Sequence, residues 1–215
     1  GTSGNPSQTL SAGQTFAGGQ TLTVVTNNIS DLNLNGGVTL NGTGFATVSI
    51  SQRTVTIGGA VVNGGGGDAG LSKAGGGTLQ LSSAASTFTG GVRVTAGTVR
   101  ILANSTVSGG VVTEGPLGTG TLTLAGGVFE TNNVNRTVFN DVVVTGNVTL
   151  RSSSNNSLTF SAAGLTTPST FTLDGNRTLT IEDPVVIQNG IALTGGATGF
   201  TKAGGSTLTL DTAYA

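Results

Sequence analysis

The sequence predicts an all-β protein with the architecture of a right-handed parallel β-helix, or β-solenoid. Three observations favour this fold. Short segments alternate apolar residues with Thr or Ser, no segment shows the periodicity of a helix, and similar segments return at a period in the twenties. Period-2 alternation is typical of a half-buried strand. A repeat of this length, with several short strands in each period, fits one coil of a solenoid.

The clearest strands are expected where Thr alternates with Val, Leu or Ile between Gly and Asn residues, with the apolar side chains inward. They lie at 78–81, 98–101, 121–124, 147–150, 178–181 and 207–210, and the spacing between the starts of the first four lies in the twenties. At roughly 20–25 residues per coil, the 215 residues predict about nine or ten coils. Stacked at ~4.8 Å, these coils would form a rod of roughly 45 Å.

Longer segments repeat as well. Residues 70–81 recur as 199–210, and residues 52–57 recur as 176–181, with a weaker copy of the second motif at 135–138. The two repeats have different offsets, which predicts loops that protrude between fixed coils. No linker divides the chain, and the glycine-rich stretch 63–77 is expected to be a wide turn. We therefore expect residues 1–215 to form a single solenoid domain, part of a longer or polymerised rod, with repeat-like segments at 70–101, 115–129 and 199–215.

The stretch from Gly70 to Ile101 resembles the autotransporter-associated β-strand repeat. The resemblance is carried by Leu71, Lys73, Gly75, Gly77-Thr78-Leu79, Leu81, Phe88-Thr89-Gly90-Gly91, Val94 and Ala96-Gly97-Thr98-Val99. Residues 115–127 look like the family's downstream segment, and the pattern restarts at Lys202 with Ser206 where the family has Gly. The resemblance implies an exported, right-handed β-helix of an extracellular or bacterial cell-surface protein, and it implies no enzymatic activity.

Composition excludes several classes of function. The chain has no Cys and no His, which removes disulfides, thiolate zinc sites and a Ser-His-Asp triad. Charged residues make up 8% and the net charge is −1, which argues against a nucleic-acid partner. No apolar run approaches the ~20 residues of a membrane span, so no membrane insertion is expected. We expect no catalytic residues, no metal and no cofactor.

The acidic residues offer little chemistry. Of the nine, only Glu182 and Asp183 are adjacent, and adjacent residues of a strand point to opposite faces. We interpret them as a polar turn after the strand at 178–181. A carboxylate pair across neighbouring coils stays open as the basis of a carbohydrate-active enzyme. The run from Asn63 to Asp68 is similar to one imperfect copy of a calcium-binding repeat. Such sites need tandem copies, so we interpret the run as a turn.

Basic residues recur at matching places. Lys73 and Lys202 occupy the same position of the 70–81 repeat, and each is expected at a turn with its ammonium in solvent; a row that binds a partner is the alternative. Solvated, outward positions are also expected for three arginines that precede strands, with a charge ladder as the alternative. These are Arg53, Arg136 and Arg177.

Aromatic and amide residues have structural interpretations. The phenylalanines are expected to stack inside the solenoid rather than to form an exposed sugar-binding stripe; they are Phe16, Phe45, Phe88, Phe129, Phe139, Phe160, Phe171 and Phe200. The Asn-x-Ser/Thr triplets are attributed to composition rather than to glycosylation; they begin at Asn28, Asn41, Asn104, Asn135, Asn147, Asn155 and Asn176.

The sequence therefore predicts a structural protein and not an enzyme. The favoured function is that of a subunit or segment of a bacterial surface fibre, whose coils pair end to end with another copy or with flanking repeats of a longer chain. The alternative is an adhesin passenger segment that binds glycans or a host surface. A carbohydrate-active β-helix enzyme is less favoured because the chain has few acids.

Overall fold

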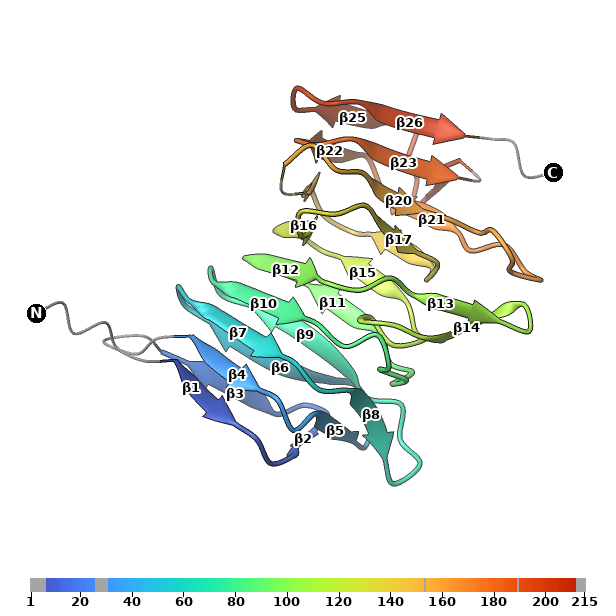
Figure 1. The fold of residues 1–215 in the computed structure, drawn as a ribbon. Helices are drawn as coiled ribbons and strands as arrows, with labels where there is room; N and C mark the ends of the chain where they lie inside the picture. The colour runs from blue at the N-terminus through green and yellow to red at the C-terminus, as the bar shows by residue number, and fades with distance from the viewer. Residues whose placement is uncertain (1–6, 26–30, 153, 189, 212–215) are drawn as a thin grey trace, which may run out of the picture.

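The computed structural model describes residues 7–25, 31–152, 154–188 and 190–211, and every regular element in these ranges is a β-strand. The strands stack along a rod that runs from the blue N-terminal end to the red C-terminal end (Figure 1). Nearly all pairings are parallel and join one coil to the next. The predicted β-solenoid is thereby confirmed, with about eight turns.

Each coil contributes strands to the same faces of the rod in the same order. The first sheet has nine strands: β1 (Gln8–Leu10), β4 (Leu32–Leu34), β7 (Thr54–Ile57), β10 (Thr78–Leu81), β12 (Thr98–Ile101), β16 (Val128–Thr131), β19 (Val148–Arg151), β22 (Arg177–Ile181) and β25 (Phe200–Ala203). The second sheet has eight: β3 (Thr21–Val24), β6 (Phe45–Ile50), β9 (Gly70–Ala74), β11 (Val92–Val94), β15 (Leu122–Leu124), β18 (Val142–Val144), β21 (Phe171–Asp174) and β24 (Ala192–Thr194).

The third face is interrupted in the middle of the rod. A three-stranded sheet covers its N-terminal part: β2 (Gln14–Ala17), β5 (Val38–Asn41) and β8 (Val61–Gly64). A four-stranded sheet covers its C-terminal part: β17 (Arg136–Val138), β20 (Leu158–Phe160), β23 (Val185–Gln188) and β26 (Leu208–Asp211). Between them lies an antiparallel hairpin of β13 (Thr106–Ser108) and β14 (Val111–Glu114), which extends from the side of the rod (Figure 1).

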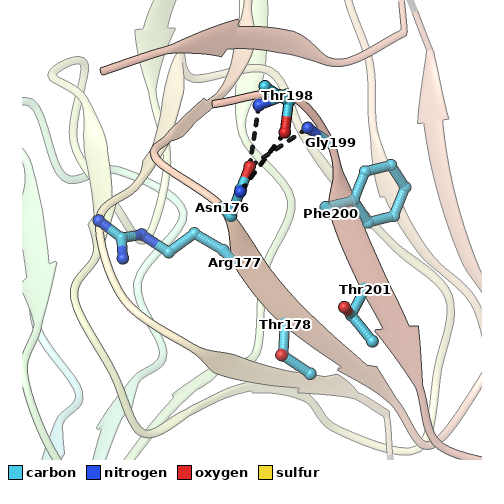
Figure 2. A pocket seen from close by; sticks show the side chains of 7 residues that line it. All are labelled: Asn176, Arg177, Thr178, Thr198, Gly199, Phe200 and Thr201. Atoms are coloured by element: carbon cyan, nitrogen blue, oxygen red, sulfur yellow. Dashed lines mark hydrogen bonds between the residues drawn. The ribbon is translucent and has the colours of Figure 1, made fainter. Parts of the chain in front are cut away.

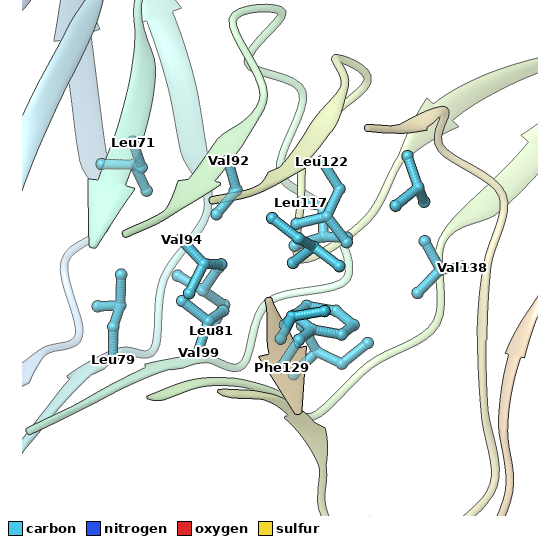
Figure 3. Close-up of a cluster of buried hydrophobic side chains, with 14 of the residues drawn as sticks. Leu71, Leu79, Leu81, Val92, Val94, Val99, Leu117, Leu122, Phe129 and Val138 are labelled. Atoms are coloured by element: carbon cyan, nitrogen blue, oxygen red, sulfur yellow. The ribbon is translucent and has the colours of Figure 1, made fainter. Parts of the chain in front are cut away.

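The core consists of columns of apolar side chains that run along the rod. In the first sheet, Leu79 pairs with Val99, and Val99 pairs with Phe129. All three are fully buried. Side chains of the second sheet, including Leu71 and Val92, face this column across the interior (Figure 3). The alternation in the sequence thus puts the apolar residue of each pair inside, as predicted.

Half of the phenylalanines form part of this core. Phe88, Phe129, Phe160 and Phe171 are buried. The ring of Phe160 lies 6.3 Å from that of Phe129 and 5.0 Å from that of Phe171 between centroids, the second contact edge-on. The expectation of interior positions holds for these four. The others are only half-buried: Phe16, Phe45, Phe139 and Phe200.

The number of turns is lower than the nine or ten predicted because two coils are long. The coil from Thr98 to its register partner Val128 is half as long again as the preceding coil, from Thr78 to Thr98. The hairpin β13–β14 accounts for the extra length. A second long coil separates Val148 from its partner Leu179. The spacing from 98 to 121 is therefore not a coil length, since the strand at 121–124 falls on β15 of the second sheet, whereas 98–101 is β12 of the first.

The two copies of the longest sequence repeat occupy different corners. Residues 70–81 form β9 of the second sheet and β10 of the first, whereas residues 199–210 cover β25 of the first sheet and most of β26 on the third face. The offset between the copies is therefore not a whole number of coils. The repeated unit is a corner, consisting of a strand, a glycine turn and a strand, and this unit fits more than one corner of the coil.

Amide and carboxylate side chains hold successive coils together at the corners. In each case a side-chain oxygen accepts a hydrogen bond from a backbone N–H about one coil away, at 2.7–3.1 Å. The acceptors are Asp31, Asn63, Asn104, Asn135, Asp141, Asn147 and Asn176. Five of these seven acceptors are asparagines, and four of the five begin Asn-x-Ser/Thr triplets. The triplet at Asn28 lies outside the described residues.

Candidate functional site

Charged side chains gather on the outer face of the first sheet. Arg100, Glu130 and Arg151 stand in register on β12, β16 and β19. The Glu130 carboxylate, 2% exposed, accepts from Arg100 Nε at 2.6 Å and from Arg151 Nε at 2.5 Å. Arg151 Nη1 reaches Glu182 Oε2 at 3.2 Å. We call these four residues the charge ladder.

The alternating signs of the charge ladder follow from the stacking. In-register strands place side chains of successive coils ~4.8 Å apart, where like charges repel and opposite charges attract. Burial by itself lowers the pKa of Arg151, but its hydrogen bonds and charge attraction to Glu130 and Glu182 outweigh this effect and raise that pKa above its ordinary value. The guanidinium stays charged, and the ladder joins four coils.

The carboxylates of this region are engaged in structural contacts. Both oxygens of Glu130 accept from arginines. Asp183, next to Glu182, accepts from the backbone N–H groups of Ser152 at 3.0 Å and Asn155 at 3.2 Å. Glu182 and Asp183 follow the end of β22, as the turn interpretation predicted. Within the described residues, no three His, Cys, Asp or Glu side chains come together as a metal site.

The three arginines singled out in the sequence are not members of the ladder. Arg53 is exposed, as expected. Arg136 Nε donates to Asn132 Oδ1 at 3.0 Å, and burial lowers the pKa of Arg136. Arg177 Nε is buried and has no hydrogen-bond partner among the described residues. The expectation of solvated, outward arginines is therefore wrong for Arg136 and Arg177.

Lys73 corrects a second expectation, since its ammonium lies inside the solenoid and not in solvent. The residue is 0% exposed. It stands in register with Val48 and Val94 at an inward-facing position. Its Nζ donates to the carbonyl oxygens of Ala74 at 2.7 Å, Gly75 at 2.6 Å and Ala96 at 3.2 Å. The side chain thus caps the carbonyls of a corner and joins two coils.

The glycines around Lys73 make room for this arrangement. Gly97 has a φ of +66°, and a Cβ built on it would lie 2.6 Å from Lys73 Nζ. A side chain there would be strained and would displace the ammonium. Burial lowers the pKa of Lys73 from 10.5 to about 8. Residues 73–75 therefore form an internal corner.

Lys202 repeats part of this geometry one corner further round the coil. It pairs with Leu179 at an inward-facing register position, and its Nζ donates to Gly204 O at 2.7 Å, as Lys73 Nζ donates to Gly75 O. Lys202 lies in the last described coil and is exposed. The two lysines belong to different sheets, so they do not form the alternative partner-binding row.

A groove with a volume of about 230 Å³ lies between the starts of β22 and β25 (Figure 2). Asn176 Oδ1 accepts from Thr198 N at 2.9 Å and Gly199 N at 3.3 Å along one side. Phe200 and Thr201 point away from this amide in Figure 2. The polar atoms of Asn176 and Thr198 are thus used in joining coils, and we interpret the groove as the space beside a corner cap.

Comparison with known proteins agrees with this architecture. Residues 71–101 match the family model of the passenger-associated-transport-repeat. The match begins in β9 and ends with β12, and it includes the Lys73 corner. No curated protein and no solved structure matches the chain.

The β-solenoid fold and the family match over residues 71–101 together support a repeat protein of the autotransporter passenger type. That family is one of structural and adhesin-type β-helices, not of enzymes, and it implies a secreted or cell-surface location. Among the described residues, no helix has the length and hydropathy needed to cross a membrane.

Replacement of Lys73 tests the internal corner. Lys73→Met keeps the length of the side chain but leaves three carbonyls without their donor, and we expect the free energy of unfolding at pH 7 to fall by about 3 kcal/mol. Between pH 8 and 10.5 the unfolded state holds the Lys73 proton more tightly than the folded state. Denaturant titrations across this range should therefore show the wild type gaining stability relative to the variant as pH rises.

Lys202→Met is the matched control, because Lys202 is exposed and donates to one carbonyl. We expect it to cost less than about 1 kcal/mol. Equal losses in the two variants would contradict a special role for the internal lysine.

Replacement of Glu130 tests the charge ladder. Glu130→Gln removes the negative charge between two guanidiniums, and we expect a loss of about 3 kcal/mol in the free energy of unfolding. Glu182→Gln, at a side chain that is 46% exposed, should cost less than about 1 kcal/mol. Urea denaturation of both variants measures the difference, and a Glu130→Gln protein as stable as the wild type would show that the ladder does not join the coils.

Proposed function

We propose that this chain is a structural stretch of an extracellular rod, a segment or subunit of a bacterial surface fibre in which coils pair end to end. The observation that supports this function most is the continuity of the coil-to-coil pairing. One parallel sheet runs in register from β1 to β25. The charge ladder, the Lys73 corner and the amide caps all bind one coil to another, so the most distinctive polar groups serve the rod itself.

The strands at the two ends of the described rod also support pairing with a further coil. Leu10 of β1, Leu193 of β24 and Leu210 of β26 are 42%, 42% and 44% exposed. Their register partners in the next coil inward are fully buried; these are Leu34, Leu173 and Ile187. Among the described residues, the end strands thus present apolar side chains of the core and have a pairing partner on one edge only, which are the features that favour strand addition.

Few charges oppose such pairing. Charged residues on edge strands are a common means by which proteins prevent edge-to-edge association. Four of the six end strands, β1, β2, β3 and β24, contain no charged residue, and β25 and β26 contain one each, Lys202 and Asp211. The added coil comes from a second copy or from flanking repeats of the same protein. In the first case the isolated chain forms rods that lengthen with concentration, and in the second it does not.

A pair of single substitutions on β26 tests pairing between copies. The 215-residue chain is expected to form rods that lengthen with concentration, seen by sedimentation velocity and negative-stain electron microscopy. Leu210→Lys puts a charge on the apolar end surface and should shorten the rods strongly. Thr209→Lys adds the same charge to the neighbouring residue, which faces outward in register with Val186, and should leave association unchanged.

Short rods of one size at every concentration would contradict pairing between copies. They would favour a segment whose neighbouring coils belong to the same protein. Equal loss of association in both variants would show that net charge, rather than the apolar end surface, controls assembly.

A further inference from the structure

The extra residues of the two long coils meet on one side of the rod. The first insertion is the hairpin β13–β14, and the second is the segment 161–170 between β20 and β21. Thr166 N donates to Gly110 O at the tip of the hairpin at 2.8 Å. Two insertions from different coils thus support each other, although neither takes part in the stack of the first and second sheets.

A cleft of about 280 Å³ lies between these insertions, and we call it the lateral cleft. Phe139, Asn140 and Asp141, which connect β17 to β18, contribute to its lining. The hairpin adds Val111 and Val112, and the segment 161–170 adds Leu165, Thr166, Thr167 and Pro168. The half-buried Phe139, which did not join the interior stack, lies here.

The polar groups of the lateral cleft are held in place by the coils beneath. Asn140 is buried; it accepts from Ser105 Oγ at 2.8 Å and donates to the carbonyls of Gly118 at 3.0 Å and Gly120 at 2.8 Å. Asp141 is exposed, and its Oδ1 accepts from Thr170 N at 2.7 Å and Thr170 Oγ1 at 3.0 Å. The carboxylate is therefore oriented before any ligand arrives, which lowers the cost of ordering it.

The chemistry of the lining selects a class of ligand. An aromatic ring and aliphatic side chains offer an apolar surface, while threonine hydroxyls and a carboxylate offer hydrogen-bond acceptors and donors. No Lys or Arg is among the described residues that line the cleft, so nothing in this lining would neutralise an anion. A pyranose ring has an apolar C–H face and a rim of hydroxyl groups that donate to carboxylates, and it matches both parts of the lining.

We propose that the lateral cleft binds a neutral pyranose unit of a glycan. The ring packs on Phe139, and sugar hydroxyls donate to the Asp141 carboxylate. This binding site lies on the flank of the rod and does not depend on end-to-end pairing. It would give a structural rod a point of attachment to a carbohydrate surface.

The experiment is a titration of the ¹⁵N-labelled 215-residue chain, followed by NMR. The probes are the methyl glycosides of glucose, galactose and mannose and N-acetylglucosamine, with N-acetylneuraminic acid as an anionic comparison. We expect saturable, millimolar binding of at least one neutral sugar, with shifts confined to the amides around the lateral cleft. The anionic sugar should bind at least about tenfold more weakly.

Two conservative variants test the assigned contacts. Asp141→Asn keeps Oδ1 as the acceptor for Thr170 but removes the charge, and Phe139→Leu keeps an apolar side chain but removes the flat ring. Each should weaken sugar binding by about tenfold or more. Unchanged binding in both variants would overturn the proposal, as would the absence of saturable shifts with every neutral sugar.

The hairpin tip supplies a matched pair of variants for the shape of the lateral cleft. Gly109 and Gly110 have φ values of +60° and +81°, so Ala at either position carries similar backbone strain. A Cβ on Gly110 would overlap Thr166 Oγ1, whereas one on Gly109 would meet nothing. Gly110→Ala should therefore weaken sugar binding, and Gly109→Ala should not. Equal effects of the two substitutions would contradict a site formed by both insertions.

Discussion

The structure depends on in-register, parallel pairing of each coil with the next. Because the pairing has no stagger, a side chain in one coil stands ~4.8 Å above its counterpart in the coil below. Every position in the stacked strands therefore belongs to a column, and a column tolerates only residues that can stack. Apolar side chains fill the inner columns, as in the series Leu79, Val99 and Phe129. Threonine, which is uncharged and suits a pleated surface, occupies many outer positions. The low charged fraction of the chain, 8%, agrees with this constraint.

The same constraint explains where the unusual polar residues lie. Glu130 is tolerated on the sheet because the register places arginines on both sides of it. Lys73 is tolerated in the interior because a glycine turn and the next coil bring three carbonyls within hydrogen-bond distance of its ammonium. A buried charge without such partners would be strongly unfavourable. Both groups therefore fix the register of neighbouring coils, in addition to any stability they provide.

Local patterns predict the strands well and their places in the coil less well. The alternation at 78–81 and 98–101 matches the bounds of β10 and β12. The strand β16, which has Glu130 near its centre, is not recognisable in this way because its sequence does not alternate Thr with apolar residues. When β16 is overlooked, the next recognisable strand after 98–101 is 121–124, and the spacing between these two is mistaken for a coil length. The sequences of 70–81 and 199–210 also indicate that the two copies are equivalent. Both form a strand, a glycine turn and a strand, but nothing in this pattern shows which corner of the coil each copy occupies.

The lateral cleft could not be predicted from sequence because its parts come from three successive coils. Neither the hairpin nor the segment 161–170 has a sequence motif for binding, and their contact at Gly110 and Thr166 exists only once the coils are stacked. The stacked strands along the rod axis thus follow from the local alternation of residues. The lateral cleft on the flank depends on the lengths of the two insertions. The two kinds of feature serve different purposes, since the first builds the rod and the second varies its surface.

The most direct test of in-register stacking uses cysteine pairs, since the chain has no native cysteine. Thr56 and Gln80 are register partners on β7 and β10, whereas Thr54 is the partner of Thr78. Disulfides require Cα atoms about 4.4–6.8 Å apart; the in-register pair meets this range, and Thr54 lies about 8 Å from Gln80. Under mild oxidation, Thr56→Cys with Gln80→Cys should form a disulfide rapidly, and Thr54→Cys with Gln80→Cys should remain reduced. Faster disulfide formation in the second pair, or none in the first, would contradict the in-register pairing of the coils.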